Sequence, residues 1–247
     1  MMKLMLLQQL TIIAGPALIM AFTLTTSPRE TLGIRWPATK WLAAGMVLPF
    51  LLHPLSVEAV SSLHWFFGEL PPEVTRPFAA MSDENLSLGF VLLAFAVAPG
   101  ICEEIAFRGF ILSGCAHGGR RVLAIVMSSV AFGIMHMIPQ QVFNATLLGL
   151  VIGTLAVRSR SLFPCILFHF LNNMLGVAHG RIGKTLPSAG WQEMFFAQIE
   201  GSLRYRWPTC LICVAFAAPI LVWLARPLFG GQRVADEVDF AHVLKDA

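Results

Sequence analysis

Three charged side chains stand within a long apolar run, in the stretch CEEIAFRGF at positions 102–110. Glu103 and Glu104 are adjacent, and Arg108 follows four residues after Glu104. A charge at the centre of a bilayer costs about 2.5–3.5 kcal/mol on insertion scales, so such residues pair with one another or serve a function. Because residues four apart share one face of a helix, the spacing predicts an ion pair between Glu104 and Arg108. Glu103 would lie on another face, free to act.

Polar residues that can work with a carboxylate recur in two later apolar segments. Phe132 and His136 are four residues apart, as are His169 and Asn173, whereas residues 85–180 contain no acidic residue besides the two glutamates. One carboxylate, two imidazoles and one amide facing a common interior can activate a water molecule and stabilise an oxyanion. The pattern therefore predicts hydrolysis at a site shared by three helices.

Zinc is the alternative for the same donors. Glu103, His136 and His169 would form a set of two histidines and one carboxylate, with an open position for water. We favour the metal-free interpretation, because an asparagine on the same helix face as His169, at Asn173, suits an oxyanion hole better than a ligand set.

Membrane-spanning helices are needed to position these residues. The chain has 247 residues, of which 56% are hydrophobic and 13% charged, and its mean hydropathy is +0.72. Soluble domains carry about 25% charged residues, so the composition indicates an integral membrane protein. A helix crosses the bilayer core with about 20 apolar residues. The pattern predicts an all-α, polytopic bundle of about seven to eight transmembrane helices, with segments at 4–25, 40–57, 86–112, 121–138, 142–157, 161–179 and 208–227.

Loop charges predict the orientation of this bundle. The net charge is +3, a mild excess that positive loops on the cytoplasmic side explain without any nucleic-acid partner. The loops at 114–121 and 158–161 each carry two arginines, so we expect them to face the cytoplasm. The C-terminus would lie on the same side, in a protein of the bacterial plasma membrane.

The three motifs together resemble those of the CPBP family, whose members are also called Abi or CAAX-protease-like proteins. The family is related to the type II CAAX prenyl endopeptidase and to lysostaphin resistance protein A. The resemblance covers about 100–180 and includes E-E-x-x-x-R, F-x-x-x-H and H-x-x-x-N. It implies an all-helical intramembrane endopeptidase whose cavity opens toward the cytoplasm.

The resemblance also implies a role for each matching residue. Glu103 would activate the water, assisted by His136, while His169 and Asn173 would hold the oxyanion. The second glutamate of the motif would be locked by the arginine.

The resemblance also divides the chain into three parts. We expect N-terminal transmembrane helices and an interfacial segment in 1–84, the catalytic core in 85–180, and a loop, the last span and a short polar tail in 181–247.

Two further classes of function compete with hydrolysis. The chain would otherwise be a non-proteolytic immunity or regulatory protein of the membrane, or a transporter with a proton relay. Scaffolding does not require a free carboxylate beside two imidazoles, and no inverted repeat supports a transporter. The favoured interpretation is an endopeptidase, embedded in the lipid bilayer, that acts on a membrane-associated or lipid-anchored peptide or protein.

Overall fold

The computed structural model of the protein describes residues 2–68, 79–116, 120–183, 190–199 and 202–229. The predicted polar tail lies outside these residues, as does part of the predicted interfacial segment.

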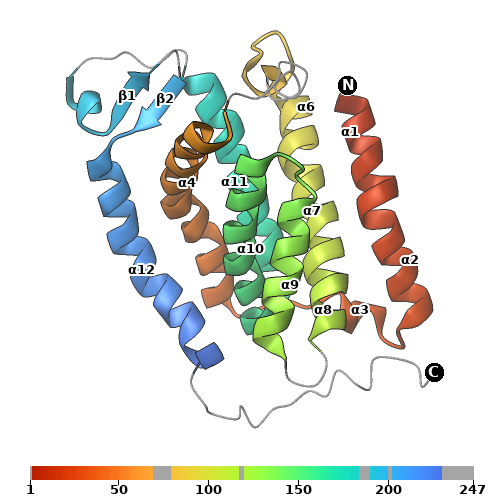
Figure 1. The fold of residues 1–247 in the computed structure, drawn as a ribbon. Coiled ribbons are helices and arrows are strands. Elements are labelled where there is room, and N and C mark those ends of the chain that lie inside the picture. Colours follow the sequence, from red (N-terminus) through yellow and green to blue (C-terminus); the bar gives the residue numbers. More distant parts are fainter. Residues whose placement is uncertain (1, 69–78, 117–119, 184–189, 200–201, 230–247) are drawn as a thin grey trace.

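Seven helical columns stand within the described residues at the seven predicted positions (Figure 1). Two columns are composite. The first consists of α1 (Met2–Gln8), η1 (Gln9–Ala14) and α2 (Gly15–Leu24). The third consists of α6 (Leu88–Leu92), η3 (Leu93–Val97), α7 (Ala98–Glu104), η4 (Ile105–Ile111) and α8 (Leu112–Cys115). The others are α4 (Thr39–Phe67), α9 (Arg121–Ile134), α10 (Pro139–Ser159), α11 (Phe163–Ile182) and α12 (Trp207–Phe229).

Five of these columns are long and apolar enough to cross a membrane, counted over the described part of the chain. The other two are α11, which carries His169 and Asn173, and α9, which carries Phe132 and ends before His136. The 14 residues of α9 span only about 21 Å at 1.5 Å per residue. Helix α11 has 20 residues but includes two histidines and two asparagines. The polytopic all-α bundle is confirmed with five candidate spans, whereas a membrane crossing by α9 and by α11 stays a prediction.

Short elements join the columns. They are α3 (Pro28–Thr31), η2 (Ala80–Ser82), η6 (Gly190–Met194), β1 (Phe196–Ile199) and β2 (Ser202–Tyr205). The two strands form an antiparallel hairpin in which Phe196 faces Tyr205. This hairpin lies in the segment before the last span where the sequence pattern predicts a loop.

Helix α4 corrects an expectation, because it continues to Phe67 instead of ending near residue 57. The added part contains Glu58. Its carboxylate accepts hydrogen bonds from Arg204 Nη2 at 2.6 Å and from the Tyr205 backbone N–H at 2.8 Å. The hairpin therefore provides partners for a charged side chain in the added part of the helix.

Packing places the first and last columns at opposite edges of the bundle (Figure 1). Helix α12 packs on α4, whereas α1, η1 and α2 pack on the composite column that contains α7 and η4. Between these edges a buried core forms around Leu48, Leu155 and Phe168. The column with the two glutamates is thus enclosed between the first column and the core.

Three π-helical segments depart from the predicted regular α-helices. Segment η1 begins at Gln9, and η4 begins directly after Glu104, with η3 earlier in the same column. A π-helix shifts the backbone bonding to i→i+5, and such segments frequently occur at functional sites. The π-helical segments therefore lie in the first column and in the column that carries the glutamates, which are in contact near Glu103.

Helices α9 and α10 approach each other closely near the end of α9. A Cβ added at Gly133 would lie 2.7 Å from the backbone oxygen of Val142 and 2.0 Å from Thr146 Oγ1. Only a glycine permits this contact, which fixes the turn that follows α9.

Candidate active site

The predicted ion pair between Glu104 and Arg108 is present and fully buried. Arg108 Nη1 donates to Glu104 Oε1 at 2.9 Å, and both side chains are 0% exposed. Arg108 Nη2 reaches the Gly149 carbonyl at 3.4 Å, and its guanidinium carbon lies 4.2 Å from the centre of the Phe132 ring. The pair thereby connects three columns.

Glu104 has a second partner that the sequence did not indicate. His169 Nδ1 lies 2.7 Å from Glu104 Oε1, the oxygen that also accepts from the arginine. A carboxylate oxygen accepts, so Nδ1 of His169 carries the proton in this contact. The other ring nitrogen, Nε2, is 3.8 Å from Glu103 Oε2. Glu104 therefore orients the imidazole that faces the neighbouring glutamate.

Glu103 is held from the first column of the bundle. Its Oε1 accepts a hydrogen bond from Gln9 Nε2 at 2.7 Å, and its side chain remains 15% exposed. The predicted site did not include Gln9, because the motifs that define it lie between residues 85 and 180. The available signal was the pair Gln8 and Gln9 inside a largely apolar span.

His136 lies in the turn after α9, although the prediction placed it on a helix over 121–138. Its Nδ1 is 3.0 Å from the carbonyl oxygen of Phe132, which can only accept, so Nδ1 is the donor and Nε2 keeps its lone pair. The Phe132 ring also contacts His169, with centroids 5.6 Å apart. The structure places His169, and not His136, against Glu103, so the role assigned to His136 stays a prediction.

One hydrogen bond from its side-chain amide holds Asn173 in place. Its Nδ2 donates to the Phe95 carbonyl at 3.0 Å, and its Oδ1 lies 3.4 Å from Asn172 Nδ2. An amide nitrogen carries two N–H groups, so one remains for another acceptor. The structure is compatible with the predicted oxyanion contact, which stays a prediction.

The side chains predicted to bind zinc do not form a cluster in this arrangement. Across the described ranges, no three His, Cys, Asp or Glu side chains converge closely enough to hold an ion. Nδ1 of His169 faces Glu104, and Nδ1 of His136 faces a backbone carbonyl. Zinc bound by Glu103, His136 and His169 remains a prediction of the sequence, and the chemistry proposed for this site uses the chain's own side chains.

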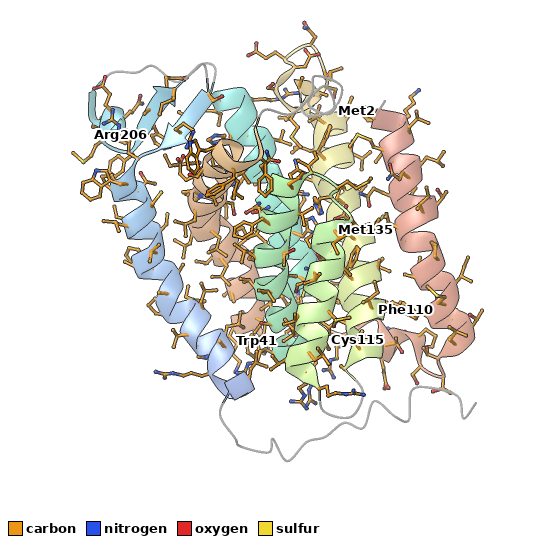
Figure 2. All side chains as sticks on the ribbon, in the orientation of Figure 1. Met2, Trp41, Phe110, Cys115, Met135 and Arg206 are labelled. Atoms are coloured by element: carbon orange, nitrogen blue, oxygen red, sulfur yellow. The ribbon has the colours of Figure 1, made fainter. Side chains whose placement is uncertain are left out.

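The site lies inside the bundle and not at one end. Figure 2 shows Met135, the neighbour of His136, between the end that carries Met2 and the end that carries Cys115. A molecule that reaches these residues must therefore enter between the helices of the bundle.

Comparison with known proteins identifies a family for the middle of the chain. Residues 85–175 match the family model described as type II CAAX prenyl endopeptidase Rce1-like. The match covers a little over a third of the chain and contains all six predicted site residues. No curated protein and no solved structure gives a significant match.

We expect Arg108→Ala to lower the free energy of unfolding by about 3–5 kcal/mol, because it leaves Glu104 buried without its countercharge. Thermal unfolding and the yield of folded protein in detergent measure this loss. The matched control is Arg120→Ala, which removes an exposed arginine and should change neither.

A double variant separates the ion pair from general packing. Glu104→Leu combined with Arg108→Met removes both buried charges and should recover much of the lost stability. A melting temperature for Arg108→Ala equal to that of the unmodified protein would contradict the structural role of the pair.

Proposed function

We propose that the buried glutamate site hydrolyses a peptide bond of a membrane-associated or lipid-anchored substrate, because residues 85–175 match the model of the type II CAAX prenyl endopeptidase Rce1-like family. The match supports CAAX-type intramembrane protease activity at the level of the family. One observation carries the finer proposal. The Glu103 carboxylate is held by Gln9 on one oxygen and faces the His169 imidazole with the other.

The proposed reaction begins with a water molecule beside Glu103 Oε2 and His169 Nε2. Glu103 accepts a proton from the water, and the water oxygen forms a bond to the carbonyl carbon of the substrate. The π electrons of the carbonyl group move to the carbonyl oxygen, which becomes the oxyanion. The remaining N–H of Asn173 donates to this oxyanion. When the carbonyl reforms, the C–N bond breaks, and the proton held by Glu103 passes to the leaving amine.

Two neighbours prepare the carboxylate for this role. Gln9 occupies Oε1 of Glu103, so Oε2 is the oxygen left to receive the proton. Glu104 holds the proton-bearing Nδ1 of His169, which directs Nε2 to the same place. Holding the groups in position before the substrate arrives lowers the entropic part of the barrier.

We expect Glu103→Gln to fold normally and to lose at least about 10²-fold in cleavage rate, since an amide cannot accept the proton. The measurement is cleavage of a panel of prenylated and other lipid-anchored reporter peptides by purified protein in proteoliposomes. Glu84→Gln, which changes an exposed carboxylate outside the site, is the control and should keep full activity. Unchanged cleavage by Glu103→Gln would exclude Glu103 as the base.

Gln9, in the first column, should contribute to catalysis through its hydrogen bond to Glu103. We expect Gln9→Leu to reduce the cleavage rate about tenfold, because a hydrogen bond to a charged group contributes about 1.5–3 kcal/mol. Its control is Gln8→Leu at the adjacent exposed position. Equal rates for the two variants would remove Gln9 from the site.

The orientation of the bundle is also part of the proposal. We propose that the loops at 114–121 and 158–161 face the cytoplasm, because of their arginines. Cys115 is exposed, so a variant that keeps this cysteine alone, with alanine at the other four, tests the assignment. We expect an impermeant maleimide to label it only after the cells are permeabilised. Labelling of intact cells would reverse the orientation.

A further inference from the structure

A second concave site lies at the end of the bundle where α3, α8 and α9 meet. It is a cavity of about 390 Å³ whose wall includes Arg29, Arg35, Arg121 and Arg160. Among the lining residues, the one acidic side chain is that of Glu30. We call this cavity the arginine pocket. Its walls come from α3, the start of α9 and the junction of α10 with α11, so segments distant in sequence bring the positive charges together.

Two cations of the arginine pocket are adjacent. Arg35 Nε donates to the backbone carbonyl of Arg160. Burial lowers the pKa of Arg35, and the positive charge of Arg160 lowers it further, whereas Glu30 raises it by less. Positive charges gathered around one cavity repel one another, so an anion bound in the cavity would be favoured.

The inner wall provides an independent observation. Arg108 lines the arginine pocket with a side chain that is 0% exposed. Its Nε is buried and has no hydrogen-bond partner within the part of the chain that the structure describes. A buried guanidinium N–H without an acceptor is costly, and an oxygen of a ligand in the pocket would supply one.

The remaining lining is apolar. Leu32, Ile34, Leu112, Val157 and Leu162 line the same cavity. The elements around it are the ends of helical columns (Figure 1), which meet the boundary between water and lipid in a membrane protein. A ligand that fits both the arginines and the apolar lining carries a phosphate next to a hydrocarbon chain.

We propose that the arginine pocket binds the phosphate headgroup of an anionic phospholipid. Arginine is suited to this role because its planar guanidinium donates two parallel hydrogen bonds to phosphate oxygens. Basic pockets between membrane helices bind lipid headgroups in this way. The arginines of ordinary positive loops need no shared cavity, which distinguishes this site from a general charge bias.

Adjacent arginines provide a matched test. Arg121 lines the pocket, whereas Arg120 is exposed and does not. The full chain is placed in phosphatidylcholine nanodiscs with increasing fractions of phosphatidylglycerol, and bound phosphatidylglycerol is counted by native mass spectrometry. We expect Arg121→Gln to weaken binding about fivefold, and Arg121→Gln with Arg29→Gln about 25-fold. Arg120→Gln should bind as the unmodified protein does, and Arg121→Lys should keep most of the affinity.

Two outcomes separate a lipid site from general loop charge and from free phosphate. Equal weakening by Arg120→Gln and Arg121→Gln would overturn the proposal in favour of general loop charge. Thermal protection by inorganic phosphate in pure phosphatidylcholine, without preference for phosphatidylglycerol, would assign the pocket to free phosphate and overturn the lipid assignment. If the double variant does not fold, Arg35→Gln replaces it with the same expectation of about fivefold. None of these measurements depends on peptidase activity.

Discussion

The buried ion pair between Glu104 and Arg108 constrains the centre of this bundle. Removing two charges from water costs several kcal/mol per ion, and the attraction between them offsets this only when other hydrogen bonds complete the site. Here the additional partners are His169 Nδ1 and the carbonyl of Gly149, and the ring of Phe132 lies against the guanidinium. Each comes from a different helix. Satisfying one pair of charges therefore fixes α9, α10 and α11 relative to the column that contains the glutamates.

The two adjacent glutamates differ in burial and in hydrogen-bond partners because of this arrangement. Glu104 is fully buried, and one of its oxygens accepts from both Arg108 and His169. Glu103 is partly exposed and accepts one hydrogen bond, from the side-chain amide of Gln9. A rotation of about 100° per residue on a helix is enough to direct the two carboxylates to different surroundings. The histidine links them, since one of its nitrogens faces each glutamate.

Spacing along single helices was sufficient to predict the ion pair and the positions of the seven columns, because both depend on local periodicity. The contacts between columns were not predictable in this way. Gln9 reaches Glu103 across 94 positions of sequence, and no local pattern encodes that contact. His136 left its predicted helix because α9 ends at Ile134. The added part of α4 carries Glu58, whose carboxylate contacts Arg204 in a hairpin formed much later in the chain.

The order in which the chain is synthesised gives the pairing within one helix a further consequence. Glu104 and Arg108 belong to the same column, so they can neutralise each other while that column enters the bilayer, before the helix bearing His169 has been made. The glutamine that meets Glu103 is already in the membrane by then, since it belongs to the first column. The column that bears Glu103, Glu104 and Arg108 can thus meet its first partners early in synthesis. The late helices complete a site whose charges have already been accommodated.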